Sequence, residues 1–281
     1  MKFLKNFFSF LKKKKKRIYL IYEDEKAFLI KSLFKEKILA IDTEFDWRNT
    51  YFPKLSLIQI STKDTVFLVD CLNLTKATEL KNLLENLDLL IFHSVRSDAT
   101  VLFSALDIKV KNVFDVQIAE KFLSKNSNKN YGEIVKKYIS LNLKKTETNS
   151  NWLKRPLTEM QIDYASDDVE YLIEIYQLQR KKLKSNFDEV LRVSNEEASL
   201  GNQELFVSRL AKINHLSDLE KKIFMWRENQ AIKKNVPPSY VFKSKQLKKI
   251  FNILKDDMDI RSLEAILKDS SLAKDLHEKL G

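Results

Sequence analysis

Acidic residues near the ends of apolar segments are the part of this sequence best suited to chemistry. Asp42 and Glu44 close the apolar segment ILAIDTEF. Because residues i and i+2 of a strand point to the same face, the two carboxylates are expected side by side. Two ionised groups in a buried element repel each other and are costly to desolvate unless a cation or hydrogen-bond donors compensate. A divalent metal ion would do so, although an Asp-x-Glu pair alone more often marks a solvated strand end.

Two further acids follow a strand-to-helix transition and lie on a helix. Asp98 comes shortly after the apolar run LLIF, where ligands gather at the carboxyl ends of strands, although an acid at a helix start is also common. On a helical wheel, Asp168 lies at the border of the apolar stripe, with Tyr164 one turn earlier on nearly the same side. Asp167 points almost directly away from that stripe. We therefore expect Asp168 and Tyr164 to face a cleft together and Asp167 to face water.

These four acids suit a particular chemistry. Carboxylate oxygens favour Mg²⁺ or Mn²⁺, whereas the presence of only one Cys and three His argues against zinc. Two such ions about 4 Å apart can activate a water molecule and stabilise the leaving 3′ oxygen of a phosphodiester. The phenol of Tyr164 is a candidate for orienting or deprotonating that water. The predicted cofactors are therefore two divalent cations.

The elements that must position these residues follow from the hydrophobic pattern. Alternating or continuous apolar runs predict strands, 3.6-residue periodicity predicts helices, and Thr158-x-x-Gln161 is a capping box that starts a helix running to about Lys184. Three strands in sequence, then strands alternating with helices, favour an α/β mixed sheet flanked by helices. The predicted strands are 38–45, 55–61, 65–70 and 89–94, and the first helices are 76–87 and 98–106.

The chain divides into four predicted parts. A basic leader (1–18) precedes the α/β domain (19–185), a helical connection (186–212) follows, and residues 213–281 form a small all-α domain with a loop at 235–239. The single Cys71 excludes a disulfide within the chain and fits a reducing cytoplasm, which is the location we expect.

The basic leader carries most of the excess charge of +11. Its eight Lys and Arg residues lie at positions 2–17 without an acid, and without them 42 basic residues face 39 acidic ones. Its apolar run is too short to span a bilayer, and the basic cluster follows that run, which makes it a poor signal peptide. Leu4, Phe7, Phe8 and Leu11 form one face of a short helix, so an anionic membrane surface is a possible partner and a solvated tail is the alternative.

Three ordered motifs resemble those of the DEDD-type 3′→5′ exonucleases that carry a tyrosine in the third motif, and within them the ribonuclease D group. The motifs are IDTEF (41–45), HSVRSD (93–98) and YASDD (164–168), with further similarity in YFPKLSLIQI, FDVQ and WLKRPLT. The resemblance covers roughly residues 20–185 and implies a ribonuclease H-like fold. It implies that Asp42, Glu44, Asp98 and Asp168 bind two metal ions and that Tyr164 positions the water. It places His93, Gln59 and Arg155 near substrate, with a core or exposed role as the alternative for each.

The C-terminal segment resembles a second module, the HRDC domain. The similarity rests on LEKKIFMWRENQA (219–231), followed by NVPP and YVF. Lysines of this segment could form a basic patch for RNA, although such runs are usually solvated. They are Lys233, Lys234, Lys243, Lys245, Lys248 and Lys249.

The expected function is a metal-dependent exoribonuclease that trims the 3′ ends of structured RNA, tRNA precursors above all, and releases nucleoside 5′-monophosphates. A DNA 3′ exonuclease stays open, since no motif reports on the 2′-hydroxyl that distinguishes RNA. A catalytically silent RNA-binding protein is the alternative from another class. The sequence does not define the oligomeric state, and a monomer is favoured.

Overall fold

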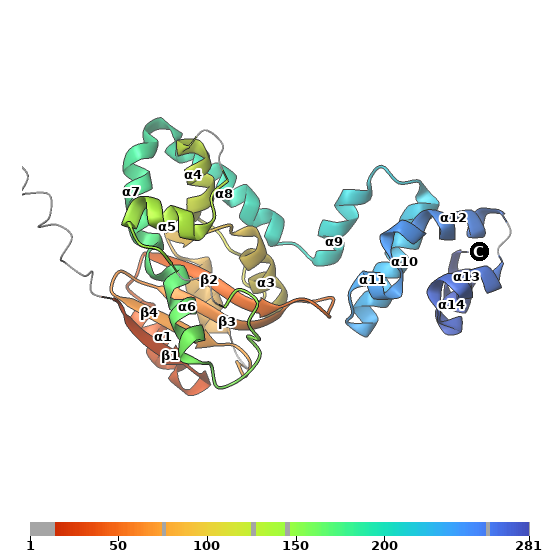
Figure 1. Ribbon diagram of the computed structural model, residues 1–281, viewed down its shortest axis with the longest axis horizontal. Coiled ribbons are helices and arrows are strands. Elements are labelled where there is room, and N and C mark those ends of the chain that lie inside the picture. The colour runs from red at the N-terminus through yellow and green to blue at the C-terminus, as the bar shows by residue number, and fades with distance from the viewer. Residues whose placement is uncertain (1–14, 75–76, 125–127, 144–146, 257–258, 281) are drawn as a thin grey trace, which may run out of the picture.

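A mixed sheet forms the centre of the N-terminal domain in the computed structural model, which describes residues 15–74, 77–124, 128–143, 147–256 and 259–280 (Figure 1). The strand order in this part of the chain is β1-β4-β3-β2-β5-β6. β2, β3 and β4 are antiparallel neighbours, whereas β1 on β4, β5 on β2 and β6 on β5 are parallel. The strands are β1 (Arg17–Ile21), β2 (Ile38–Asp46), β3 (Lys54–Ser61), β4 (Thr65–Asp70), β5 (Leu89–Phe92) and β6 (Val113–Asp115).

The alternation of side chains along the strands divides the core into two layers. Leu39 and Ile41 of β2 pack in one cluster with α1, α2 and α3, while Ala40 packs in the other with α4 to α7. The predicted α/β architecture, a mixed sheet flanked by helices, is confirmed. The helices of this domain are α1 (Lys26–Leu33), α2 (Thr78–Glu85), α3 (Arg96–Leu106), α4 (Val116–Leu123), α5 (Tyr131–Ile139), α6 (Glu159–Glu170), α7 (Leu172–Leu183) and α8 (Phe187–Gly201).

The capping box at Thr158 is present, but the helix that it starts is shorter than predicted. The Gln161 amide N–H donates to Thr158 Oγ1 (3.2 Å), and the Thr158 amide N–H donates to Gln161 Oε1 (3.0 Å). The prediction of one helix to about Lys184 is wrong, because α6 ends at Glu170 and α7 begins at Leu172. The break lets α6 lie against β3 and β4 while α7 packs on α4.

Helix α8 falls within the segment predicted to connect the domains, yet it packs against the first domain. Its polar side chains bond the β6 region: the Asp115 N–H donates to Ser194 Oγ (3.1 Å) and the Val113 N–H to Asn195 Oδ1 (3.1 Å). A Cβ on Gly201 would lie 2.6 Å from Ala99 Cβ, so glycine permits the close approach of α8 to α3. The helix therefore covers the outer edge of the sheet before the chain leaves it.

The last third of the described chain is all-α, as predicted. Its core includes Ile223, Trp226, Ile250 and Leu263. It also contains Tyr51 from the other domain, and Trp47 packs against it. The elements are α9 (Leu205–Leu210), η3 (Ala211–Ile213), α10 (Asp218–Lys234), α11 (Pro238–Val241), η4 (Ser244–Gln246), α12 (Leu247–Asp256), α13 (Ile260–Leu267) and α14 (Ser270–Leu280).

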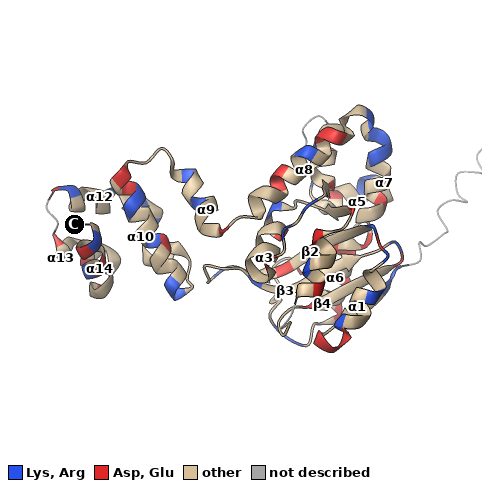
Figure 2. Cartoon of the chain, turned by 180° about the vertical axis from the view of Figure 1, so that it is seen from behind, with Lys and Arg blue, Asp and Glu red and all other residues tan. Residues whose placement is uncertain are grey.

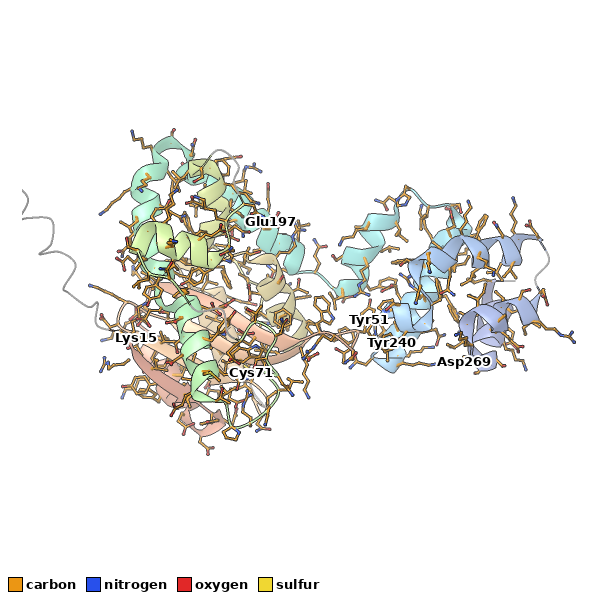
Figure 3. All side chains as sticks on the ribbon, viewed as in Figure 1. Lys15, Tyr51, Cys71, Glu197, Tyr240 and Asp269 are labelled. Atoms are coloured by element: carbon orange, nitrogen blue, oxygen red, sulfur yellow. The ribbon has the colours of Figure 1, made fainter. Side chains whose placement is uncertain are left out.

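The loop between β2 and β3 joins the two domains. Tyr51 is 0% exposed, and its hydroxyl donates to Glu228 Oε2 on α10 (3.0 Å). The Tyr51 N–H donates to Asn235 Oδ1 (3.1 Å), and the Tyr240 hydroxyl donates to Asn49 Oδ1 (2.9 Å). Figure 3 shows Tyr51 and Tyr240 together at the junction of the domains. Position 51 thus belongs to the helical core although it lies next to the strand that carries Asp42.

The start of the chain differs from the prediction at one point. Arg17 and Ile18, counted in the predicted leader, belong to strand β1, which pairs with β4 at the edge of the sheet. The amphipathic face at residues 4–11 lies outside the described residues. No helix of the described chain is both long enough and apolar enough to cross a membrane.

Candidate active site

The two acids of β2 occupy the end of the strand that lies in the middle of the sheet. Asp42 is opposite Gln59 of β3, and the pairing shifts its register between Glu44 and Phe45. Asp42 and Glu44 are partly buried and Thr43 between them is buried, and the Thr43 hydroxyl donates to Asp98 Oδ1 (2.6 Å). The alternation predicted for the Asp-Thr-Glu segment is thus present.

Asp98 reaches this place through a tight turn after β5. Ser94 adopts a left-handed backbone (φ 67°), and the Val95 N–H donates to Asp115 Oδ2 (2.9 Å). These two features hold the turn that leads into α3, whose first turn carries Asp98. The Asp98 side chain is only 5% exposed. Its carboxylate is therefore held under the end of β2 and away from solvent.

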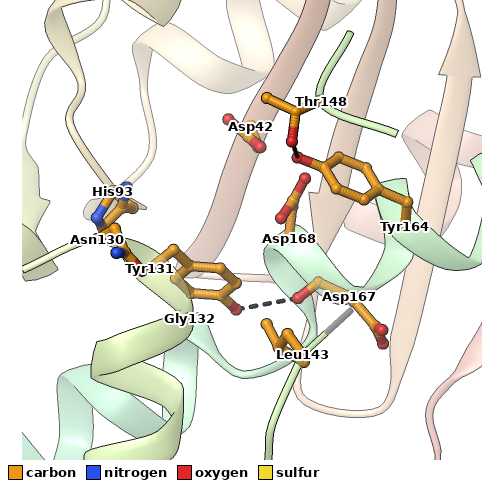
Figure 4. Close-up of a pocket in the computed structure, with 10 residues that line it drawn as sticks. All are labelled: Asp42, His93, Asn130, Tyr131, Gly132, Leu143, Thr148, Tyr164, Asp167 and Asp168. Carbon is orange, nitrogen blue, oxygen red and sulfur yellow. Dashed lines mark hydrogen bonds between the residues drawn. The ribbon is translucent and has the colours of Figure 1, made fainter. Parts of the chain in front are cut away.

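Helix α6 brings Asp168 and Tyr164 to the same place from the other side. Both line a pocket of about 260 Å³ together with Asp42. Figure 4 shows the Asp168 carboxylate between Asp42 and the Tyr164 ring, with Thr148 Oγ1 3.5 Å from the Tyr164 hydroxyl oxygen. From the helical wheel we expect Asp168 and Tyr164 to face a common cleft, and the structure brings them together in this pocket.

The prediction that Asp167 faces water is wrong. Its side chain is only 26% exposed and points away from Asp42 and Asp168, toward Lys15, whose Nζ lies 3.5 Å from Asp167 Oδ1. Its carbonyl oxygen accepts a hydrogen bond from the Tyr131 hydroxyl (3.1 Å). Lys15 and Tyr131, which precede α6 in sequence, cover this side of the helix, and a wheel drawn for an isolated helix does not include them.

Burial raises the pKa values of Asp42, Glu44 and Asp98, and repulsion from neighbouring acids adds to it for Asp42 and Glu44. Burial raises the pKa of Glu44 to about 9, and repulsion from Asp168 and Asp98 adds to it. Burial also raises the pKa of Asp42 well above its usual value, helped by Asp98, Asp168 and Glu44. The pKa of Asp98 rises to about 7 through burial, with the hydrogen bond from Thr43 acting in the opposite direction. The pKa values of Asp42 and Glu44 therefore depend on the other acids, as expected for members of one cluster.

Burial and the nearby carboxylates also keep the phenol of Tyr164 in its protonated form. Burial raises its pKa to about 12, and repulsion from Asp168 contributes next. The hydroxyl can therefore donate or accept a hydrogen bond at neutral pH without carrying charge. It faces the carboxylates as a neutral polar group.

The acidic cluster fits an oxygen-ligated divalent cation. Among the described residues, no group of three or more His, Cys, Asp and Glu side chains is arranged to hold a metal ion by itself. Mg²⁺ in sites of phosphate chemistry usually takes one or two carboxylates and completes its shell with water and phosphate oxygens. Buried acids with raised pKa values lack counter-charge, which such a cation supplies. The donors therefore suit Mg²⁺ or Mn²⁺ shared between the carboxylates and a phosphodiester.

Of the three residues expected near substrate, the structure places one in the pocket. His93 lines it, and its Nε2 lies 3.3 Å from Gln117 Nε2. Gln59 is 0% exposed, and neither polar atom of its amide has a partner. Arg155 does not line the pocket, because its guanidinium bonds Asp70 and the carbonyl oxygen of Trp152. These bonds join the loop before α6 to the end of β4, which gives Arg155 a structural role.

Sequence reasoning missed the part of the pocket contributed by α5. Asn130 and Tyr131 line it beside His93, and Asn130 caps the helix by accepting from the Glu133 N–H (3.1 Å). Asn-x-x-Glu at 130–133 is a capping box that could have identified this helix start from the sequence. Thr148 lines the pocket as well, and no comparable local signal marks it.

The fold and the residues of this pocket agree with the comparisons with known proteins. Residues 20–184 match the model of the 3′-5′ exonuclease family, and because this is more than half of the chain, the chain belongs to that family. All five residues discussed above, the four acids and Tyr164, lie in the matched region.

Among individual proteins, the chain is similar to ribonuclease D. It is 31% identical over 229 residues to ribonuclease D of Haemophilus influenzae, a match that covers 77% of this chain and 57% of that one. The crystal structure of Escherichia coli RNase D, described as an exoribonuclease involved in structured RNA processing, shares the fold with a TM-score of 0.82. That match has 22% identity and covers 94% of this chain and 73% of the other.

A more distant structure shares the fold of the exonuclease domain. Brucella melitensis NrnC with bound Mg²⁺ matches with a TM-score of 0.56 and 22% identity, covering 69% of this chain and 98% of that one. The chain spans between 57% and 66% of the length of the first ribonuclease D relatives. The similarity to those relatives therefore extends over part of each of them.

Proposed function

We propose that this protein is a metal-dependent 3′→5′ exoribonuclease that trims 3′ ends of structured RNA, tRNA precursors among them, and releases nucleoside 5′-monophosphates. The observation that carries the proposal is the meeting of Asp42, Glu44, Asp98 and Asp168 at one strand end, with raised pKa values for Asp42, Glu44 and Asp98. Family membership supports the 3′→5′ direction. The names of the ribonuclease D relatives favour RNA.

The proposed chemistry assigns a task to each residue. Two divalent cations, when bound, would activate a water molecule and stabilise the leaving 3′ oxygen. Asp42, Glu44, Asp98 and Asp168 would hold them, as ionised ligands whose mutual repulsion the cations relieve. The neutral hydroxyl of Tyr164 would orient the attacking water by hydrogen bonding. Support for magnesium comes from the related fold of Brucella melitensis NrnC with bound Mg²⁺.

The C-terminal helices are proposed to be an HRDC-like module that contacts RNA. Support comes from its all-α architecture and from the separate core around Ile223, Trp226 and Ile250. We further propose that the exonuclease domain begins near residue 19, ends near residue 185 and is followed by α8, which is packed on it. Association of residues 1–17 with an anionic membrane surface stays a prediction, tested by liposome binding after their deletion.

The deciding experiment compares substrates that differ in one property. A 5′-labelled tRNA precursor, a circularised RNA of the same sequence and a DNA strand of the same length are each incubated with Mg²⁺, Mn²⁺ or EDTA. We expect stepwise shortening of the linear RNA from its 3′ end, with metal, and no cutting of the circle. Shortening of DNA at an equal rate would favour the DNA exonuclease, and no metal-dependent product from either would leave the RNA-binding alternative.

A further inference from the structure

A second polar depression lies in the helical domain, outside the catalytic pocket. It has a volume of about 340 Å³ and is lined from α9 and η3, from α10 and from the segment that begins with α11. Arg209, Lys212 and Arg227 contribute cations to it, and Ser239 and Ser244 contribute exposed hydroxyls. Figure 2 shows Lys and Arg residues on α9 and α10, the helices on two sides of this depression. All three kinds of side chain are hydrogen-bond donors.

Arg227 is held there by its surroundings. It is 7% exposed, and its guanidinium lies over the rings of Phe224 and Phe242, 4.9 and 5.1 Å from their centroids. Nη1 donates to Ser244 Oγ (3.1 Å) and Nη2 to Glu228 Oε1 (3.1 Å), but the buried Nε has no partner. Arg227 thus brings a buried positive charge to the wall of the depression, and its hydrogen-bonding capacity is not used up within the chain.

The one acid of the depression is already engaged. Glu228 accepts from the Tyr51 hydroxyl (3.0 Å), from Arg209 Nη1 (3.1 Å) and from Arg227 Nη2 (3.1 Å). Three cations thus face one carboxylate among the residues that line this place. The remaining N–H groups of the two arginines and the exposed ammonium of Lys212 are left for a ligand of opposite charge.

We propose that this depression binds a phosphate group of a nucleic-acid backbone. The inference rests on the proposed function, since it assigns a contact for the body of the same RNA at a distance from its 3′ end. Donors without acceptors, a fixed guanidinium and an excess of positive charge match a phosphodiester, whose oxygens only accept hydrogen bonds. A contact with phosphate carries no sequence information, so it positions RNA of any sequence.

The fold links this depression to the catalytic pocket. Tyr51, which bonds Glu228 beneath the depression, follows β2 by a short loop, and β2 carries Asp42 and Glu44. The two places are therefore held at a set separation, with the helical domain extending away from the sheet (Figure 1). A substrate must be long enough to reach both places to benefit from the second one, which makes the contribution dependent on RNA length.

The test measures binding without cleavage. Fluorescence anisotropy in EDTA gives the affinity of the full chain for a long RNA hairpin with a 3′ tail and for a trinucleotide. Lys212→Gln removes one exposed cation of the depression, and Lys274→Gln on α14, equally exposed in the same domain, is the matched control. We expect Lys212→Gln to weaken hairpin binding roughly fivefold and to reduce the salt dependence by about one ion. Trinucleotide binding should not change.

Each alternative result overturns the proposal. Equal effects of Lys212→Gln and Lys274→Gln would show a general charge effect, and equal losses for hairpin and trinucleotide would show a structural one. A third arm adds a nucleoside 5′-monophosphate at matched ionic strength. If it bound in a Lys212-dependent way while hairpin binding did not depend on Lys212, the site would serve free nucleotides. Binding is measured in EDTA and does not require cleavage. A protein that showed the Lys212-dependent hairpin binding but no nuclease activity would therefore contradict the proposed function and still support this inference.

Discussion

Buried acids at two places in the same domain have pKa values shifted in opposite directions. Glu120 on α4 has a side chain that is 0% exposed, yet Lys137 (2.6 Å) and Lys129 (3.1 Å) pair with it and the Tyr138 hydroxyl donates to it (2.8 Å). Burial pushes its pKa up, but these bonds outweigh burial and lower it to about 2. Glu44 is buried among other acids instead: burial raises its pKa to about 9, and repulsion from Asp168 and Asp98 raises it further.

The difference separates a structural acid from the acids that we propose to be functional. Glu120 carries its counter-charges within the chain, so it stabilises the packing of α4, α5 and α7. In the function that we propose, the clustered acids take their counter-charge from a bound cation, and without it the repulsion between Asp42, Glu44 and Asp98 opposes folding. Burial among like charges is therefore a better mark of function than burial alone.

The largest effect is expected from Asp168→Asn. Removal of one pocket carboxylate should lower the rate of 3′-end trimming by more than the roughly 10- to 100-fold that loss of a group merely supporting a metal ligand costs. The measurement is the rate of mononucleotide release with Mg²⁺. Asp167→Asn is the matched control and should keep activity within about threefold, because the Asp167 side chain points away from Asp42 and Asp168 and substitutions away from the chemistry have small effects. Equal losses in both variants would refute the assignment of Asp168.

Tyr164→Phe should have the next largest effect. Loss of the hydroxyl leaves the carboxylates in place but removes a group that orients the water, and we expect a roughly 10- to 100-fold lower kcat with little change in KM. Tyr131→Phe removes a second hydroxyl of the same pocket, one that is bonded to the Asp167 carbonyl. If both variants lost activity equally, the pocket would need its shape and not the Tyr164 hydroxyl in particular.

In contrast to the two substitutions above, Glu120→Gln should change the stability of the protein and not its catalytic activity. It removes the charge that holds Lys129, Lys137 and Tyr138, so urea unfolding should show a loss of about 1–3 kcal/mol. Activity per folded molecule should stay the same. Because the folded pKa of Glu120 lies below its unfolded value, its contribution is present above the unfolded pKa near 4.5 and is lost as pH falls toward 2. An unchanged unfolding midpoint in urea would contradict the structural role.

The smallest effect is expected for Glu44, whose contribution to the unfolding free energy depends on pH with a sign opposite to that of Glu120. The folded pKa of Glu44, about 9, lies above its unfolded value, so metal-free protein binds an extra proton and loses that stability as pH rises toward 9. Glu44→Gln should flatten the fall in unfolding free energy between pH 6 and 8 by about 0.5 kcal/mol per pH unit, below the limit of about 1.4 for one proton. Urea titrations in EDTA measure it, and parallel curves for both proteins would exclude the effect.

Local periodicity was sufficient to predict most of the acidic cluster and its tyrosine, but not the rest of the pocket. The two-residue repeat of a strand paired Asp42 with Glu44, and the helical wheel with its capping box placed Asp168 beside Tyr164. These features depend on residues within a few positions of each other. The assignment of Asp98 needed the resemblance between families, because its approach to Thr43 across 55 residues leaves no local pattern.

The features that were missed depend on contacts between distant segments. Asp167 is covered by residues from before β1 and by α5, neither of which a wheel includes. Arg155 was expected at the substrate, but Asp70, 85 residues earlier, engages it. The break at Tyr171 exists because α6 and α7 pack on different partners. Such outcomes follow from tertiary packing, which overrides local preference.

The aromatic loop between β2 and β3 has a consequence for how the chain is made. Tyr51 is synthesised 177 residues before Glu228, the partner of its hydroxyl. At about 5–20 residues per second, roughly 10–35 s pass on the ribosome before that partner appears. During this interval the first domain can complete its sheet while the Tyr51 ring is still in water. The Tyr51 side chain is thus withdrawn from solvent and from chaperones only after the last helices have left the ribosome.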